Sequence, residues 1–260
     1  MAKLSVIARD EVAPADAYPV DRAASGIRSC ALLSPPAFSL WACDVELIDG
    51  GTIEWPERHG DDGIYIVSGE LDIDGRRCPT GGAVIVESGV AAVARAVGDT
   101  HLVHFGSRDD SPPRDGLGGP VAEHGHGVHV VGPAGVIQSG EGNSSRAVWF
   151  SDGTCATCRC QLFVVAAPTL DGKRGAAHSH SEDEIILVLD GTIKMGSYTL
   201  GPFSALCVPG DVRYALNGQP GGHRFLNWRR DVSEQIYELG SDPIVETGLA
   251  RGGRATNDVR

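Results

Sequence analysis

Three side chains able to bind a metal ion lie close together in the segment GAAHSHSEDEIILVLDG, which runs from Gly175 to Gly191. They are His178, His180 and Glu184, and an apolar run follows them. In an extended chain alternate residues face the same side, so a strand would direct all three groups into one cavity. Two imidazoles and one carboxylate suit Fe(II), Mn(II), Zn(II) or Ni(II) and leave coordination positions open for substrate or oxygen. The segment therefore predicts a site for one divalent transition metal ion.

The segments around this cluster are typical of short β-strands. The 260 residues include 35 glycines and 15 prolines, a composition that favours tight turns between short strands over long helices. Apolar or alternating stretches bounded by turn residues occur from about residue 37 to residue 105, and the pattern resumes after residue 127. Such closely spaced strands indicate an antiparallel sandwich or barrel, so we predict an all-β protein.

A constant offset of 122 residues relates the two halves of the sequence, aligning residues 64–69 with residues 186–191 and His101 with His223. Such an offset is an internal repeat and implies a duplicated β domain, with the paired histidines in equivalent structural positions. Between the halves, a stretch rich in glycine, proline and charged residues is typical of a linker. We therefore predict four parts: an N-terminal barrel over 1–110, a linker over 111–130, a C-terminal barrel over 131–245 and a tail over 246–260.

The metal-binding residues are not repeated in the first half. The same offset places the positions of the two histidines and the glutamate on Pro56, Arg58 and Asp62. Proline offers no side-chain ligand, arginine stays protonated, and a single carboxylate is a poor metal site. We therefore expect a metal ion only in the second half, and a solvated or salt-bridged side chain at Arg58.

The bulk charge and the terminal segment limit the partners and the location. The net charge of -12 would repel nucleic acids and anionic membranes, so neither is an expected partner. The N-terminus has no apolar core long enough for a signal peptide, and no later segment resembles a membrane span. The seven cysteines are an odd number in a chain too large to need disulfides, which indicates reduced thiols. We expect a cytoplasmic protein, as a monomer or homodimer.

Three cysteines lie close together at Cys155, Cys158 and Cys160. A structural zinc ion needs four ligands, and no second cysteine pair occurs at a comparable spacing. A redox Cys-x-x-Cys pair would stand at the start of a helix, whereas this pair leads into the predicted strand CQLFVV. We therefore predict half-buried strand cysteines.

Three histidines, His124, His126 and His129, lie in or just after the glycine-rich stretch. Nothing in the local sequence fixes their relative positions, as a metal site would require. We do not expect them to bind a metal ion.

Two motifs resemble those of the cupin superfamily. The spacing G-x-x-H-x-H-x-x-x-E-x-x-x-x-x-x-G from Gly175 to Gly191 resembles the first cupin motif, and the stretch from Gly201 through Pro209 to Tyr214 resembles the second. The whole chain is similar to a bicupin, which implies two small jelly-roll barrels on one polypeptide, here with the metal motif retained only in the C-terminal barrel. Where the family usually has a fourth, histidine ligand, this chain has Tyr214.

Tyr214 leaves two interpretations open. In the first, the metal ion is held by the two histidines and the glutamate, and the tyrosine is a nearby hydrogen-bond donor or general base. In the second, Tyr214 is a direct metal ligand. We favour the first because a phenol with an ordinary pKa of about 10 is a weak ligand at neutral pH.

The resemblance implies a metal-dependent enzyme that acts on a small molecule in the C-terminal barrel. We expect a non-haem dioxygenase whose Fe(II) binds substrate and oxygen together. Apolar side chains at Ile186, Val188, Phe203 and Phe225 would exclude water from the pocket. One alternative is a lyase, isomerase or aminohydrolase that uses Tyr214 as acid or base. Another is a ligand-binding or sensor protein without turnover.

Overall fold

The computed structural model describes residues 3–15, 17–18, 20–109, 122, 124–133, 137–139, 146–167, 176–239 and 242–247. Within these residues the chain is almost entirely β-strand, and the short 3-10 helix η1 (Arg9–Glu11) is the one helix. The all-β prediction is therefore confirmed. In the described part of the chain, no helix is long and apolar enough to cross a membrane.

The first sheet has nine strands among the described residues, in the order β10-β7-β4-β9-β3-β8-β5-β6, with β2 paired to β3. All of its pairings are antiparallel. Its strands are β2 (Ala23–Leu32), β3 (Leu40–Trp55), β4 (Asp62–Ser68), β5 (Glu70–Ile73), β6 (Arg76–Pro79), β7 (Ala83–Val86), β8 (Ala92–Ala96), β9 (Thr100–Ser107) and β10 (Val128–Val131).

The second sheet has eight strands in the same described ranges, in the order β1-β17-β15-β18-β13-β12-β11, with β16 paired to β15. Its strands are β1 (Ser5–Ile7), β11 (Ile137–Ser139), β12 (Arg146–Asp152), β13 (Gln161–Ala167), β15 (Glu184–Met195), β16 (Tyr198–Leu200), β17 (Ala205–Val208) and β18 (Asn217–Arg229). A smaller sheet, β14-β19-β20, is formed by β14 (His178–His180), β19 (Glu234–Leu239) and β20 (Asp242–Thr247).

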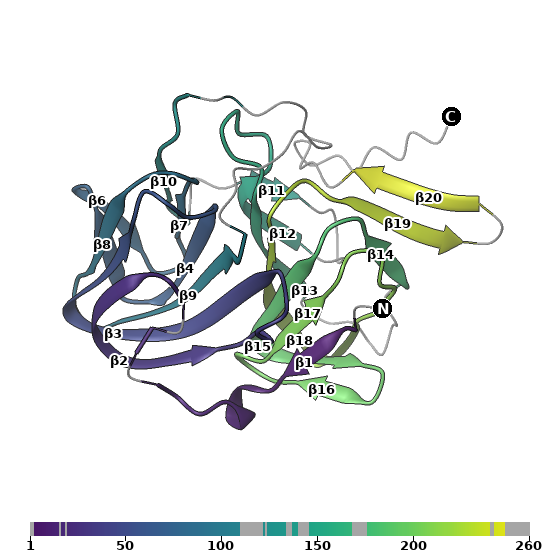
Figure 1. Ribbon diagram of the computed structural model, residues 1–260. Coiled ribbons are helices and arrows are strands. Elements are labelled where there is room, and N and C mark those ends of the chain that lie inside the picture. Colours follow the sequence, from purple (N-terminus) through teal and green to yellow (C-terminus); the bar gives the residue numbers. More distant parts are fainter. Residues whose placement is uncertain are drawn as a thin grey trace.

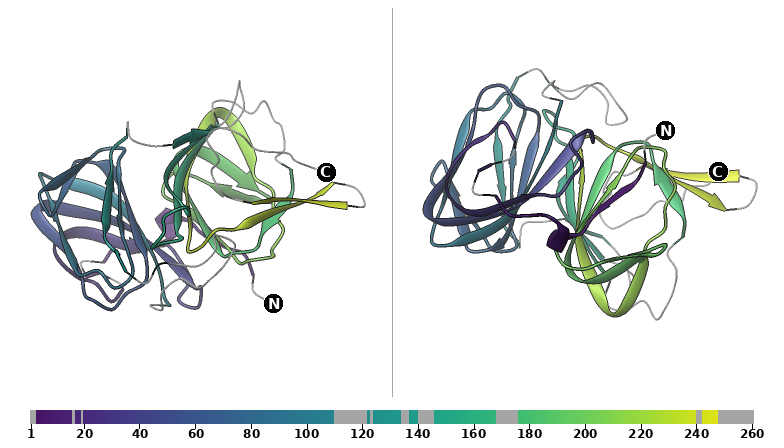
Figure 2. Two further views of the ribbon diagram at one scale, coloured as in Figure 1. Left: turned by 90° about the horizontal axis from the view of Figure 1, so that it is seen from above. Right: turned by 60° about the horizontal axis from the view of Figure 1, so that its bottom comes forward.

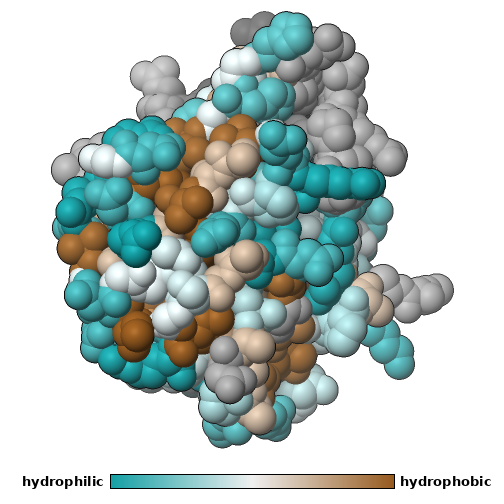
Figure 3. Space-filling view, turned by 60° about the vertical axis from the view of Figure 1, so that its left-hand side comes forward, coloured by the Kyte–Doolittle hydropathy of each residue, from teal (hydrophilic) through white to brown (hydrophobic). Residues whose placement is uncertain are grey.

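The two large sheets curl and lie side by side, as Figures 1 and 2 show, with the first sheet on the left of Figure 1. The repeat in the sequence corresponds to equivalent strand neighbours, because β4 lies between β7 and β9 as β15 lies between β17 and β18. Each sheet encloses its own apolar cluster. Residues on the outer face shown in Figure 3 alternate between hydrophobic and hydrophilic groups, as on an ordinary protein surface.

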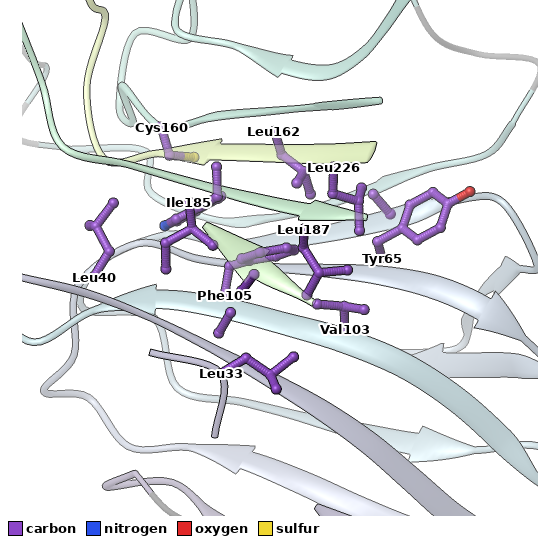
Figure 4. Packing of buried hydrophobic residues seen from close by; sticks show 14 of the residues in the cluster. Leu33, Leu40, Tyr65, Val103, Phe105, Cys160, Leu162, Ile185, Leu187 and Leu226 are labelled. Carbon is purple, nitrogen blue, oxygen red and sulfur yellow. The ribbon is translucent and has the colours of Figure 1, made fainter. Parts of the chain in front are cut away.

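A third apolar cluster fills the space between the two sheets, as Figure 4 shows. β15 is buried on both faces because Ile186 and Val188 point into its own barrel while Ile185 and Leu187 join this shared cluster. This explains its unbroken apolar run, since a strand covered on both sides needs no polar alternation. Burial of each large apolar side chain contributes about 1.5–3 kcal/mol. The residues labelled in Figure 4 are Leu33, Leu40, Tyr65, Val103, Phe105, Cys160, Leu162, Ile185, Leu187 and Leu226.

The boundaries predicted at residues 110 and 131 do not separate the two sheets. β1, from the first residues of the chain, pairs with β17 of the second sheet, and β10, which begins inside the predicted linker, pairs with β7 of the first sheet. Each covers backbone groups that an uncovered sheet edge would leave unpaired. Most of the linker and all but the first two residues of the predicted tail lie outside the described residues.

A substitution at Gly63 would test how closely the two sheets pack. A Cβ atom added to Gly63 would lie 2.6 Å from Cζ3 of Trp228 and 3.3 Å from Cδ2 of Leu162, both on the opposite sheet. We expect Gly63→Ala to lower the free energy of unfolding by about 1–3 kcal/mol, because the buried indole has no room to move away. Urea denaturation measures this. Gly132→Ala is the control, since no atom of the described residues lies within 4 Å of its new Cβ; equal effects of the two changes would contradict the packing.

Candidate functional site

The local backbone brings the predicted residues together where β14 meets the start of β15 in the second sheet. His178 and His180 form the ends of β14, and Glu184 is the first residue of β15. Tyr214 and His178 exchange two backbone hydrogen bonds, from His178 N to Tyr214 O at 3.0 Å and from Tyr214 N to His178 O at 2.9 Å. On its other side β14 pairs with β19. The His-x-His segment is therefore held between the tyrosine and β19.

The four predicted side chains lie in one cluster. The hydroxyl of Tyr214 is 3.2 Å from Nε2 of His178, and the two imidazole centroids are 5.1 Å apart. Nε2 of His180 is 3.7 Å from Oε1 of Glu184. His180, Glu184 and Tyr214 are buried, and Tyr214 belongs to the apolar cluster inside the barrel. The spacing in the sequence thus identified side chains that the fold places together.

Arg229 also belongs to this cluster, although nothing in the sequence pattern pointed to it. It is the last residue of β18 and lies directly opposite Glu184 in the strand pairing. Its Nε and Nη2 donate to Oε2 of Glu184 at 3.2 and 2.9 Å, and Nη2 also donates to Nε2 of His180 at 3.0 Å. Asn227, two residues earlier on the same face, donates to the same carboxylate oxygen at 2.8 Å.

These contacts define the protonation of the cluster. Arginine only donates, so Nε2 of His180 accepts and its proton lies on Nδ1, which is 3.3 Å from the carbonyl of Glu234. Burial lowers the pKa of His180 to about 4. Burial alone would raise the pKa of Glu184, but the Arg229 charge, together with His180 and the hydrogen bonds from Tyr214 and Asn227, outweighs it and holds this pKa at about 2. Burial, with the Glu184 charge, raises the pKa of Tyr214 well above its ordinary value.

At neutral pH the cluster therefore contains a carboxylate, a neutral imidazole and a neutral phenol beside a guanidinium cation. A neutral phenol can donate a hydrogen bond or a proton, but it is not a base. Of the two roles predicted for Tyr214 as a nearby group, this favours the donor.

The donor atoms of the cluster indicate whether it could bind a metal ion. Oε1 of Glu184 is buried and has no hydrogen-bond partner within the described part of the chain, and the lone pair of His180 Nε2 lies beside it. Arg229 already places a cation between these two residues. His180 and Glu184 thus fit a cation, but a metal ion bound to both requires Arg229 to move. The described residues contain two groups of possible metal ligands whose ligand atoms all lie within 4.8 Å of one another. Neither of these groups includes His180 or Glu184.

The first sheet has a related buried ion pair, between Asp62 and Arg22, at the position equivalent to Glu184. Asp62 accepts from Arg22 Nε at 2.8 Å and from Trp55 Nε1 at 2.8 Å, and it lies 3.2 Å from Nε2 of His104. Despite burial, His104 and Arg22 hold the pKa of Asp62 below its ordinary range. Arg58 is exposed, as expected. The first sheet therefore has a carboxylate paired with an arginine at this position, and lacks the two histidines that accompany Glu184 in the second sheet.

One prediction about a neighbouring residue needs correction. Phe203 does not pack in the apolar cluster of the second sheet: it lies in a turn with φ 61°, and its ring contacts His101, with centroids 4.9 Å apart, on the side of the shared core. His101 itself binds Asp44, with Nε2 2.6 Å from Oδ1, whereas Nδ1 of the buried His223 has no hydrogen-bond partner in the ranges that the structure describes. The paired histidines thus occupy equivalent strands but make different contacts.

The cysteine and histidine predictions also differ from the structure. Cys155, Cys158 and Cys160 lie in the loop between β12 and β13, not in a strand, and the last two are fully buried. His129 lies in β10, where pairing with Ile85 of β7 fixes its position. The β pattern that resumes after residue 127 includes this strand, but its partner β7 could not be read from the local sequence, because strand pairing depends on a distant segment.

No family model and no curated protein matches the chain. Solved structures do. A mutant of oxalate decarboxylase from Bacillus subtilis matches with a TM-score of 0.62 at 12% identity, over 87% of this chain and 77% of that one; that enzyme has Mn(II) centres.

Two further structures match over most of their own length. A putative glyoxylate-induced protein from Pseudomonas aeruginosa matches with a TM-score of 0.63 at 15% identity, over 86% of this chain and 87% of that one. Protein Ylba from E. coli matches with a TM-score of 0.60 at 12% identity, over 87% and 90%. At these identities the likeness shows the fold alone.

Proposed function

We propose that this chain is a metal-dependent cupin-type enzyme that acts on a small organic acid inside the second barrel. The observation that carries the proposal is the buried pair of His180 and Glu184, which presents an unprotonated imidazole nitrogen and an unpartnered carboxylate oxygen to the same space. His178 completes the set of two imidazoles and one carboxylate. A bound divalent ion would polarise a substrate carboxylate or carbonyl group.

The surrounding residues would then bind and orient the substrate. Arg229, once released from Glu184, offers the planar pair of donors that matches a carboxylate. Tyr214 would donate a hydrogen bond from its neutral hydroxyl. Ile186, Val188 and Phe225 lie in the barrel's apolar cluster and would keep water out. A small carboxylate is also the chemistry of oxalate, on which the similar decarboxylase acts.

The reaction type has two candidates. The open coordination of two histidines and one carboxylate suits an Fe(II) dioxygenase. One similar structure is a decarboxylase, which favours a lyase, isomerase or aminohydrolase in which the neutral Tyr214 hydroxyl would donate a hydrogen bond to the substrate. Oxygen uptake during turnover separates them, because turnover in an anaerobic chamber excludes the dioxygenase.

We further propose a bicupin organisation for the chain. Separate interior clusters in the two large sheets and the equivalent neighbours of β4 and β15 support it. In this arrangement the first barrel, with its Asp62–Arg22 pair, is the scaffold and the second is the reactive one. A binding or sensor protein without turnover is favoured instead if Arg229 never leaves Glu184.

Metal content tests the proposal. We expect protein purified without an affinity nickel column and loaded with Mn(II) or Fe(II) to retain metal in the second barrel. His180→Ala should weaken that binding by at least the roughly 10- to 100-fold that loss of a supporting residue causes. Equilibrium dialysis with elemental analysis measures it, and His124→Ala, at an exposed histidine, is the control. Equal Mn(II) binding by wild type and His180→Ala would exclude the site.

A further inference from the structure

A second group of metal-ligand atoms lies where the two large sheets meet. It consists of Glu87, His129, Cys155 and Cys158, each offering one ligand atom within 4.8 Å of the others. Glu87 directly follows β7, His129 lies in β10, and the two cysteines lie in the loop between β12 and β13. Three segments distant in the sequence therefore converge on this point.

Glu87 is the centre of the group. Its carboxylate is fully buried, and Oε1 is 2.5 Å from Nε2 of His129, 2.8 Å from the hydroxyl of Thr157 and 3.3 Å from Sγ of Cys155. Oε2 accepts the backbone N–H of Gly127 at 3.0 Å. A buried carboxylate is costly unless it is paired or coordinates a metal ion. The threonine and the amide hold it in one orientation, as supporting groups do around metal ligands.

The two thiols complete a set of four donors. Sγ of Cys155 lies 3.9 Å from Nε2 of His129, and Cys158 stands three residues later, within the same group. The Cys-x-x-Cys spacing is the usual one for two zinc thiolates, and zinc takes four ligands from cysteine, histidine and carboxylate groups in tetrahedral geometry. Thiolate ligands also favour zinc over manganese, which prefers oxygen donors.

A cavity of about 250 Å³ borders the group and gives an ion access to it. Three of the four ligands, His129, Cys155 and Cys158, line this cavity, together with Trp149 and Asp152. His129 is also open to solvent on one side. A metal site needs such an access path as well as its ligands.

We propose that Glu87, His129, Cys155 and Cys158 bind a zinc ion that links the first sheet to the loop between β12 and β13. The site is separate from the cluster of His180 and Glu184, and it differs in chemistry because it contains two sulfur ligands. Its zinc would join the two large sheets directly. The proposal does not depend on activity in the second barrel.

Cobalt substitution tests the site through a signal that only thiolates give. We expect protein purified without an affinity nickel column, then loaded with Co(II), to show intense thiolate-to-cobalt charge-transfer absorption in the near ultraviolet. The Cys155→Ala/Cys158→Ala double variant should lose this band and one equivalent of retained zinc. Cys78→Ala, at a buried cysteine in β6, should keep both.

Different experimental results would contradict the two proposed metal sites. His180→Ala should keep the thiolate–cobalt band, so loss of Mn(II) binding with the band intact assigns the two sites separately. Wild-type protein that binds Co(II) without a thiolate band would overturn the zinc site, and this result needs no variant to fold. Retention of zinc and the band by the double variant would also overturn it.

Discussion

Replacing Glu184 with glutamine is expected to lower the free energy of unfolding of the metal-free protein by about 3–5 kcal/mol. Glutamine keeps the shape of the side chain but removes the charge that pairs with Arg229. Both donating atoms of Arg229 bind the same carboxylate oxygen, and the arginine is only 5% exposed. An unpaired guanidinium would then remain in the barrel. Urea denaturation at neutral pH measures the loss.

The matching double variant identifies the cause of that loss. Glu184→Gln combined with Arg229→Met removes both charges and replaces the arginine with an apolar side chain. We expect it to recover much of the stability, because a buried pair exchanged for apolar groups is often near neutral. A double variant as unstable as the sum of its single changes would show that Arg229 and Glu184 do not interact in solution.

The same pair predicts how stability depends on pH. The pKa of Glu184 is about 2 in the folded protein, against about 4.3 for an unfolded glutamate. Since the folded pKa is the lower one, the stabilisation is complete above about pH 4.3 and is lost as the pH falls toward 2. The free energy of unfolding of wild type should therefore decline more steeply over this range than that of Glu184→Gln. Parallel curves would contradict the assigned pKa.

Replacing Trp228 with alanine is expected to cost about 3–5 kcal/mol. The indole is fully buried in the shared cluster and stacks on Phe105 of the first sheet, with ring centroids 6.0 Å apart. Its loss leaves a cavity between the sheets that their strands cannot close. Chemical denaturation followed by circular dichroism measures the effect.

Two further variants serve as controls for the Trp228→Ala result. Val93→Ala, at a side chain 46% exposed, should change stability by no more than about 0.5 kcal/mol. Trp228→Phe should cost much less than alanine, because it keeps a ring and removes an indole N–H that has no hydrogen-bond partner among the described residues. If Trp228→Ala costs no more than Val93→Ala, the two sheets do not share a packed core in solution.

The sequence alone predicted the features that depend on neighbouring residues. Alternation along an extended chain placed His178, His180 and Glu184 on one side, and the resemblance of the second motif added Tyr214; the structure puts all four in one cluster. The internal repeat likewise predicted the equivalent positions of β4 and β15. These features follow from periodicity, which is a local property of the chain.

The tertiary structure determined which residues distant in the sequence contact this cluster. Arg229 lies 45 residues from Glu184, and only the register of β15 against β18 sets the two side by side. His129 and Cys155 looked unrelated in the sequence, because their approach requires β10 to cross to the first sheet and the sheets to pack together. Strand partners and register are chosen by the burial of whole faces across the molecule, so no short stretch of residues contains them.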